Sequence, residues 1–321
     1  MKVVIQIPCF NEENTLADAV AKIPRKIAGV DEVELQIIDD GCTDGTAALA
    51  KKLGIDYIVK VPGRNRRWLG RAFKLGIEHA LAVGADIVVN TDGDNQYPAE
   101  RISDLIRPIL DKEAQIVIGD RNPSHYKEFS PIKRALQGLG NLVFRALTTE
   151  NVRDAVSGFR AYSKEALLQI NIVTNYTYTV DTLMQAYKKG IDIAWIEINP
   201  NPKTRESRLI TSIFSKVRKS GTTILRMFTI YTPFKCFLSF AALPALIGVV
   251  LLGRFGYFFL IGNGDGHIQS VIVGAVSLVI ALQILMLGII ADLISVNRAL
   301  VEDSLKKIKL LDEEIRTLKK D

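Results

Sequence analysis

Cysteine is scarce in this sequence, and the patterns that cysteine usually forms are missing. There are three cysteines, Cys9, Cys42 and Cys236, and no Cys-x-x-Cys pair. An odd number of isolated cysteines is typical of free thiols in a reducing compartment. No signal peptide is expected either, because MKVVIQIPCF has only a short apolar stretch and no small-residue cleavage site. Both absences predict that residues 1–230 stay in the cytosol.

Two further absences exclude classes of function. The sequence has no glycine-rich N-terminal phosphate loop with a basic residue, which argues against a sugar nucleotidyltransferase. No nucleic-acid-binding motif accompanies its net charge of +6. The basic residues gather instead in residues 203–235, where eight Lys or Arg stand beside one acid, Glu206. We expect this segment to meet anionic lipid headgroups.

Long apolar runs are absent from the first 230 residues but present near the end. Residues 236–253 and 268–291 form stretches of 18 and 24 residues without Asp, Glu, Lys or Arg. A bilayer core needs roughly 20 such residues. The short polar link at 262–267 predicts a transmembrane helical hairpin, the alternative being a pair of buried core helices. Positive charge before the first run predicts that both ends of the hairpin are cytoplasmic.

These features divide the chain into four predicted segments. A cytosolic globular domain covers residues 1–209, and an amphipathic juxtamembrane helix covers residues 210–233. Two transmembrane helices cover residues 234–296, and a cytosolic helical tail covers residues 297–321. Apolar residues of the tail repeat at intervals of three and four. This spacing fits a short coiled coil, and hence a homo-oligomer, or a solvated amphipathic helix.

The N-terminal half alternates short apolar runs with amphipathic stretches. Strands are expected at 2–8, 33–39, 56–61, 86–90 and 115–119, and helices at 12–26, 43–53, 69–83 and 99–111. This alternation predicts an α/β fold with a mostly parallel sheet and helices on both faces. Residues 130–198 show a less regular α+β pattern. In such sheets ligands bind beyond the carboxyl ends of the strands.

Polar clusters follow four of the predicted strands. They are Pro8-Cys-Phe-Asn-Glu12, Asp39-Asp-Gly-Cys-Thr-Asp-Gly-Thr46, Asp92-Gly-Asp94 and Gly119-Asp-Arg121. Because parallel strands end at the same edge of a sheet, we expect these clusters to build one site.

Asp92 and Asp94 are the most distinctive of these residues, because two like charges converge directly after an apolar strand. With the amide of Gln96 they offer the hard oxygen ligands that Mg²⁺ or Mn²⁺ favours. A divalent ion would offset the repulsion and neutralise a departing diphosphate. The alternative is an acidic turn, since Asp-Gly and Asp-Asn are common in turns.

A second acidic pair, Asp39 and Asp40, closes another apolar strand. Capping by Thr43 or Asp44 explains the start of the following helix. Capping does not explain the two carboxylates that precede Gly41. A carboxylate at this position can accept an N–H from a nucleotide base.

The ordered motifs IPCFNEE, IDDGCTDGT, TDGDNQYP, GDR and DAVSGFRAYS (154–163) resemble those of family 2 glycosyltransferases with the GT-A fold. More closely, the chain is similar to the polyprenyl-phosphate glycosyltransferases, which include dolichyl-phosphate mannose synthases and undecaprenyl-phosphate sugar transferases. The resemblance covers roughly residues 1–230, and a following membrane hairpin also occurs in the family. It implies an inverting enzyme that moves a sugar from a UDP- or GDP-sugar to undecaprenyl or dolichyl phosphate at the cytosolic leaflet.

The resemblance also implies roles for individual residues. The expected catalytic residues are Asp92, Asp94 and Arg121, with Asp92, Asp94 and Gln96 on the metal and donor diphosphate. Arg121 and Arg134 would receive the acceptor phosphate, and Ser157-Gly-Phe-Arg160 resembles the acceptor-side loop. The substrate-binding set contains Pro8, Phe10, Glu12, Asp39, Asp40, Gly93, Arg134, Ser157, Arg160, Arg205 and Arg208. Within it, Pro8, Glu12 and Asp40 would hold the base and ribose, and Arg205 and Arg208 would lie near the donor diphosphate.

Two other functions predict features that differ from those of this sequence. Polysaccharide synthases usually carry Gln-x-x-Arg-Trp after the metal site and more membrane spans, whereas here Arg67-Trp68 precedes it. A non-catalytic membrane assembly subunit predicts damaged metal and base motifs, and these are intact. No general base is assigned, because a lipid phosphate is already anionic near neutral pH. Asp181 would orient the acceptor or cap a helix.

Overall fold

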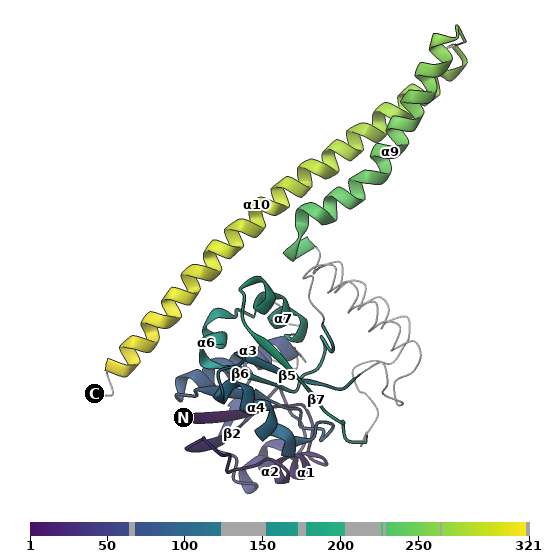
Figure 1. The fold of residues 1–321 in the computed structure, drawn as a ribbon. Helices are drawn as coiled ribbons and strands as arrows, with labels where there is room; N and C mark the ends of the chain where they lie inside the picture. Colours follow the sequence, from purple (N-terminus) through teal and green to yellow (C-terminus); the bar gives the residue numbers. More distant parts are fainter. Residues whose placement is uncertain are drawn as a thin grey trace. The chain divides into compact units, whose positions relative to one another are not determined.

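The computed structural model describes residues 1–63, 68–122, 152–172, 178–202, 226, 229–263 and 265–318 (Figure 1). The chain forms two compact units. One unit comprises Met1–Ser212 with Ile308–Asp321, and the other comprises Ile213–Lys307. The first unit contains the sheet, and the second contains the first apolar helix and most of the second.

A seven-stranded sheet with the order β3-β2-β1-β4-β6-β5-β7 lies at the centre of the first unit. Among the described strands only β6 runs antiparallel to its neighbours, β4 and β5. The strands are β1 (Lys2–Cys9), β2 (Glu32–Asp39), β3 (Tyr57–Lys60), β4 (Ile87–Asn90), β5 (Ile116–Asp120), β6 (Arg160–Ser163) and β7 (Ile193–Glu197). The predicted α/β class with a mostly parallel sheet is confirmed.

The predicted helices of the N-terminal half are present, with shorter ends. The described helices of this unit are α1 (Leu16–Ala21), α2 (Thr46–Lys52), α3 (Leu69–Ala82), η1 (Ala99–Arg101), α4 (Ile102–Leu110), α6 (Lys164–Gln169) and α7 (Thr179–Lys188). The helix expected from residue 12 begins only at Leu16. Asn11, directly before the predicted start, has a left-handed φ of 57°, and residues 13–15 form a turn instead of regular helix.

Helices cover both faces of the sheet (Figure 1). On one face the alternate residues of β1 pack in the main apolar cluster with side chains of α1, α2 and α4. Representative buried members are Val3, Ile5, Ile7, Leu16, Ala50 and Ile102. The period-2 alternation of strand side chains sends the other half of β1 to the opposite face.

Helix α3 lies against that opposite face. A Cβ placed on Gly76 would approach Gln6 Oε1 to 2.4 Å and Ile38 Cδ1 to 2.9 Å. Glycine therefore lets the α3 backbone approach the sheet at this point. Phe73 of α3 stacks on the ring of Tyr178 with centroids 3.8 Å apart, which joins α3 to the start of α7.

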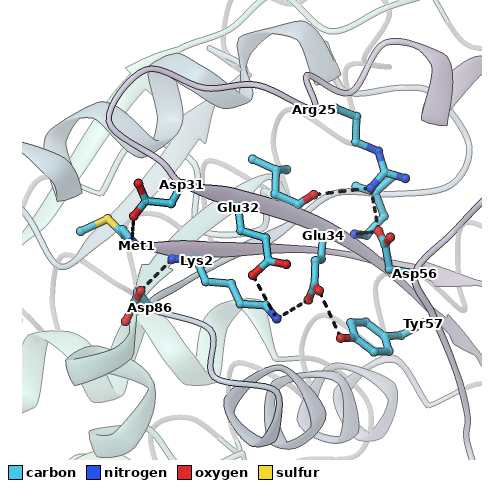
Figure 2. A network of polar contacts seen from close by, with 11 residues as sticks. Met1, Lys2, Arg25, Asp31, Glu32, Glu34, Asp56, Tyr57 and Asp86 are labelled. Carbon is cyan, nitrogen blue, oxygen red and sulfur yellow. Dashed lines mark hydrogen bonds and ion pairs between the residues drawn. The ribbon is translucent and has the colours of Figure 1, made fainter.

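The amino-terminal edge of the sheet carries a network of paired charges (Figure 2). Lys2 Nζ lies 2.7 Å from Glu34 Oε2, and the Lys2 N–H donates to Asp86 Oδ2 over 2.7 Å. Asp56 accepts from Arg25 Nη1 at 2.6 Å. The N-terminal amino group pairs with the Asp31 carboxylate. Each of these acids therefore has a cationic or N–H partner.

Two long apolar helices follow the sheet in the chain. Helix α9 (Pro233–Leu260) has 28 residues, and α10 (Ile268–Leu318) has 51 residues; η2 (Asp265–His267) precedes α10. Both are long and apolar enough to cross a membrane, and only 17% of each apolar window is buried. Such exposure of apolar side chains argues against the alternative of core helices.

Small residues mark the contact between the two helices. A Cβ on Gly248 of α9 would lie 2.7 Å from Leu278 and 2.9 Å from the Gly274 carbonyl of α10. Such close backbone approach at glycine is typical of helix packing in membranes.

Helix α10 continues without a break through the predicted second span and the predicted tail. At 1.5 Å per residue it is about 75 Å long, more than twice a hydrocarbon core of about 30 Å. The predicted boundary at 296/297 therefore falls inside one helix, and the division of the chain into four segments stays a prediction. The juxtamembrane helix expected at 210–233 falls almost wholly outside the described residues.

Candidate functional site

The polar motifs of the sequence meet at the carboxyl-terminal edge of the sheet. The turns after β1, β2, β4 and β5 emerge there because these strands are parallel. Antiparallel β6 begins at this edge, with Arg160 paired in register with Asn90 and Ile118. The loop that precedes β6 therefore arrives beside the turn that follows β4. This topology brings together segments more than 60 residues apart.

The turn after β4 contains Asp92 and Asp94. Asp94 accepts hydrogen bonds from the Gln96 backbone N–H at 3.2 Å and from Gln96 Nε2 at 2.7 Å. Burial, with the neighbouring Asp94 charge, raises the pKa of Asp92 to about 7, although Arg121 opposes the rise. In this arrangement the Gln96 amide supports Asp94, and metal ligation by Gln96 stays a prediction.

This carboxylate pair fits a divalent cation by the chemistry of its donors. Two acidic side chains one residue apart supply hard oxygen atoms, and a cation would favour the ionised form of Asp92. Within the described residues no group of three or more His, Cys, Asp or Glu could hold a metal ion. A cation here would therefore keep coordination positions for water or phosphate, as Mg²⁺ commonly does.

Gly93 brings this turn against the turn after β1. Its carbonyl accepts from Thr15 Oγ1 at 2.9 Å. A Cβ at Gly93 would lie 3.0 Å from Cys9 Sγ and 3.3 Å from Glu12 Cγ. Glu12 is 7% exposed and adds to the negative charge that raises the pKa of Asp92. The structure thus places Gly93 and Glu12 together, as the motifs predicted.

The turns after β1 and β2 are hydrogen-bonded to each other. Asn11 Oδ1 accepts from the Thr43 N–H at 2.8 Å, and the Glu12 N–H donates to Thr46 Oγ1 at 2.8 Å. Glu13 Oε2 accepts from the Gly45 N–H at 3.0 Å. Pro8, near the end of β1, and Phe10, directly after the strand, are both partly exposed beside this joined pair of turns.

Asp39 and Asp40 have different surroundings. Asp39 Oδ1 accepts from the Gly41 and Cys42 N–H groups at 3.1 and 2.7 Å, so it holds the turn. Burial, opposed by a hydrogen bond from the Trp68 backbone, raises the pKa of Asp40 to about 6. Asp40 is partly exposed and is the better placed of the two to meet a ligand.

Arg121 is held by an acid that the sequence analysis did not single out. Its Nε and Nη2 donate to the two oxygens of Asp154 at 2.7 and 2.9 Å. Asp154 is fully buried, and Arg121 lies over the Tyr97 ring at 6.0 Å. Burial is outweighed by Tyr97, Asp154 and Asp92, which raise the pKa of Arg121. Asp154 opens the DAVSGFRAYS motif, and that position was its only signal.

The loop before β6 lies beside Asp92. The Gly158 N–H donates to Tyr97 Oη at 2.8 Å, and a Cβ at Gly158 would lie 3.7 Å from Asp92 Oδ1. Ser157 is fully buried, and its Oγ has no hydrogen-bond partner among the described residues. The loop thus brings its backbone at Gly158 next to the acidic turn.

The resemblance implied that Arg160 touches substrate, but its position in the structure does not favour such a contact. It is fully buried, and its guanidinium donates to the carbonyls of Ser157, Ala155 and Thr179 and to Thr182 Oγ1, at 2.7 to 2.9 Å. Four donors are committed to the protein interior. Arg160 therefore ties the loop to the start of α7 rather than presenting its charge to a ligand.

Asn201 is a second residue that the sequence analysis missed. Its Nδ2 donates to the carbonyls of Asn95 and Tyr97 at 3.0 and 3.3 Å, and its N–H donates to the Gln96 carbonyl at 2.9 Å. These three hydrogen bonds therefore stabilise the turn that contains Asp94. No local pattern in Asn-Pro-Asn-Pro reveals this contact.

Arg134, Arg205 and Arg208 lie outside the described residues. Asp181 is buried in the first turn of α7, where a negative charge favours the helix dipole.

Comparison with known proteins gives this arrangement its class. The model of the family described as Glycosyl transferase family 2 matches residues 4–170. A solved structure, glucosyl-3-phosphoglycerate synthase of Mycobacterium tuberculosis in complex with Mn²⁺, UDP and glucosyl-3-phosphoglycerate, superposes with a TM-score of 0.57 at 22% identity. That match covers 71% of this chain and 78% of the synthase. The sheet and its loops thus have the GT-A-like fold.

Two curated relatives extend the comparison. The chain is 27% identical over 206 residues to the polyprenol monophosphomannose synthase of Mycolicibacterium smegmatis, covering 61% of this chain and 76% of the relative. It is 24% identical over 325 residues to Glycosyltransferase AglJ of Haloferax volcanii, covering 97% and 98%. The chain belongs to glycosyl transferase family 2 and is a glycosyltransferase.

Proposed function

We propose that this enzyme transfers a sugar from a nucleoside-diphosphate sugar to a polyprenyl phosphate at the cytosolic leaflet of a membrane, with inversion at the anomeric carbon. The observation that carries the proposal is the juxtaposition at the carboxyl edge of the sheet. The acidic turn of Asp92 and Asp94, the loop at Gly158 and the paired Arg121 meet there within one unit that precedes two apolar helices.

The donor side consists of the turns after β1, β2 and β4. Asp40 would accept an N–H of the base, with Pro8, Phe10 and Glu12 around base and ribose and with Asp39 bracing the turn. Asp92 and Asp94 would hold a divalent cation, Mg²⁺ or Mn²⁺, which supplies charge neutralisation for the diphosphate when bound. The Mn²⁺ and UDP named for the related synthase support this assignment. UDP and GDP donors both remain candidates.

The acceptor side consists of Arg121, the Ser157–Gly158 loop and Tyr97. The polyprenol named for the mycobacterial relative supports a polyprenyl acceptor, either undecaprenyl or dolichyl phosphate. Arg121 turns Nε and Nη2 to Asp154, which orients the planar guanidinium next to the site. The buried Ser157 hydroxyl supplies a further donor. Arg134, Arg205 and Arg208 are proposed to add positive charge toward the two phosphate groups.

The chemistry is a single displacement. An anionic oxygen of the lipid phosphate attacks the anomeric carbon, a new carbon–oxygen bond forms, and the bond to the donor diphosphate breaks. The electron pair leaves with the nucleoside diphosphate. The nucleophile carries its charge already, so no side chain must remove a proton. One displacement inverts the configuration at the anomeric carbon.

The membrane placement follows from the substrate. A polyprenyl chain keeps the reacting phosphate at the bilayer surface, and α9 with α10 would anchor the enzyme there. We propose that the catalytic domain, the basic juxtamembrane segment and the tail all lie on the cytosolic side. The tail of α10 presents exposed Leu305, Ile308 and Leu311, which would pair copies in a homo-oligomer.

The test is glycolipid synthesis by the detergent-purified full-length protein. Undecaprenyl or dolichyl phosphate is incubated with Mn²⁺ or Mg²⁺ and each of a panel of UDP- and GDP-sugars, and the lipid is analysed by mass spectrometry. We expect a sugar phospholipid from one donor and none from the polyprenol that lacks phosphate. Asp94→Ala should lose the product, whereas Asp104→Ala, an exposed acid of α4, should keep it. Sugar on a growing polysaccharide, or no turnover of any donor, would overturn the proposal.

A further inference from the structure

Three buried amides stand side by side on the central strands, a polar feature that the proposed chemistry does not explain. Gln36 of β2, Gln6 of β1 and Asn90 of β4 occupy one register across the sheet. All three are 0% exposed. A buried amide without partners destabilises a fold, so a row of amides in a core requires a complete set of hydrogen bonds.

The amides form a continuous chain. His79 Nδ1 lies 2.8 Å from Gln36 Oε1, and Gln36 Nε2 lies 3.3 Å from Gln6 Oε1. Gln6 Nε2 lies 2.9 Å from Asn90 Oδ1. Asn90 Nδ2 then reaches the Gly158 carbonyl at 2.9 Å and Tyr178 Oη at 2.8 Å. The chain thus runs from α3 across three strands to the loop beside Asp92.

Backbone carbonyls fix the direction of every bond in this chain. The Gly158 carbonyl can only accept, so Asn90 must present its amide nitrogen there and its oxygen to Gln6. Gln6 must then donate to Asn90 and accept from Gln36. The Gly76 carbonyl, 2.8 Å from Gln36 Nε2, demands the same orientation of Gln36. His79 must therefore donate from Nδ1, which sets its tautomer.

Asn90 uses both of its amide protons at the site end. One goes to the Gly158 carbonyl, and the other goes to Tyr178 Oη, which itself donates to the Gly158 carbonyl at 3.2 Å. Tyr178 is held in turn by its stack on Phe73. Two donors thus converge on one carbonyl of the loop that lies beside Asp92.

We propose that Asn90 and Tyr178, through its hydroxyl, are positioning residues. They hold the Gly158 carbonyl and so keep the Ser157–Gly158 loop at a fixed distance from Asp92. Asn90 lies two residues before Asp92 on the same chain. One side chain therefore sets the distance between the acidic turn and the loop. The inference rests on the proposed function in one respect, that this loop faces the acceptor. A misplacement of about 1 Å in such a loop costs about 10²-fold in rate.

The rival interpretation is a purely structural role, in which the amides only satisfy the core. The two interpretations differ in how the effect of a substitution depends on position. A structural role predicts that loss of activity follows loss of stability at any point of the chain. A positioning role predicts that Asn90 and Tyr178 affect turnover and that Gln36, at the far end, affects stability alone.

The experiment compares three variants of the full-length enzyme with the wild type. Tyr178→Phe removes one hydroxyl and keeps the ring stack, Asn90→Leu removes both donors, and Gln36→Met is the matched buried control. For glycolipid synthesis we expect kcat to fall about tenfold in Tyr178→Phe and about 10²-fold in Asn90→Leu, with KM for the donor within twofold. Gln36→Met should lower Tm and keep kcat within twofold.

A second measurement needs no substrate. Amide hydrogen exchange at Gly158, whose N–H bonds Tyr97 Oη, should accelerate at least tenfold in Tyr178→Phe and stay unchanged in Gln36→Met. Wild-type kcat and exchange in Tyr178→Phe would overturn the inference, as would activities of all three variants that simply follow their Tm. If the wild type makes no glycolipid, the proposed acceptor is wrong and exchange at Gly158 alone decides the positioning role.

Discussion

Acidic residues at the two edges of the central sheet differ in their partners and in the direction in which their pKa values shift. At the amino-terminal edge the carboxylates are paired with cations or N–H groups (Figure 2). Burial alone would raise the pKa of Asp56, but the Leu35 N–H and Arg25 outweigh it, so its pKa is lowered. At the carboxyl-terminal edge burial raises the pKa of Asp92 to about 7 and that of Asp40 to about 6.

This difference separates stability from function. An acid with a lowered pKa contributes stability when ionised, whereas an acid with a raised pKa lowers the stability of the fold when it ionises. Asp92, with Asp94 and Glu12 nearby, is therefore costly near neutral pH unless a ligand neutralises it. Such repulsion between like charges is expected at a site that binds a cation or a phosphate-bearing substrate.

The largest effect should come from the carboxyl edge. Asp94→Asn removes the charge that faces Asp92, and we expect transfer to fall by at least about 10²-fold, the scale of losing one strong electrostatic contact in an active site. The metal-free protein should at the same time become more stable, because the repulsion is relieved. Initial rates and Tm in chelator measure the two effects. If Asp94→Asn lowered both the rate of transfer and Tm, the contrast between the two edges would be wrong.

The next effect tests Asp154, an acid of the carboxyl edge that is paired with a cation, as Asp56 is at the amino edge. Asp154→Asn leaves the largely buried guanidinium of Arg121 without its paired carboxylate, which should cost about 3 kcal/mol, or about 6–12 °C in Tm. The double variant Asp154→Asn with Arg121→Gln should regain part of this loss. Thermal unfolding of single and double variants measures the coupling. Equal Tm values for Asp154→Asn and wild type would show that the pair is not a stabilising one.

The position of the site could be predicted from the sequence, because the ends of parallel strands meet at one edge. The motifs that contain Asp92, Asp94, Asp40 and Glu12 each follow an apolar run, and the structure brings these motifs to one edge of the sheet, while the roles of the four residues stay predictions. The motifs were sufficient for this placement because their residues lie close to where the chain leaves a strand.

The residues that hold these motifs could not be predicted. Asn90, Asp154 and Asn201 act on partners 68, 33 and about 105 residues away. The placement of β6 between β4 and β5 brings the first of these pairs together. The position of β6 between β4 and β5 cannot be recognised in the local sequence, because it depends on which strands pair and not on the β-propensity of single residues. Arg160 is the opposite case. It belongs to a sequence motif, but its place in β6 leaves its side chain fully buried.

A moderate effect should appear in the pH dependence of nucleotide binding. The pKa of Asp40 is about 6, so the carboxylate that would accept a base N–H is ionised above pH 6 and protonated below it. Affinity for UDP or GDP should therefore be constant above pH 7 and fall by up to about tenfold per pH unit below pH 6. Metal-free titration calorimetry from pH 5 to 8 measures this. Asp40→Asn should bind weakly at all pH values, and an unchanged slope in that variant would assign the titration to another group.

The smallest effect should come from the amino edge, where Asp56→Asn is the counterpart of Asp94→Asn. The Asp56 side chain is 35% exposed and accepts from Arg25 and the Leu35 N–H, so its loss should lower stability by about 1 kcal/mol. Its pKa is lowered, so this contribution is present above the ordinary value of 3.8 and lost as pH falls through the lower folded value. The Tm difference between wild type and Asp56→Asn should therefore be constant from pH 5 to 8 and shrink toward pH 3, while kcat at pH 7 stays within twofold. A large loss of kcat in Asp56→Asn would mean that the two edges are coupled through the sheet, and the separation of stability from function between them would fail.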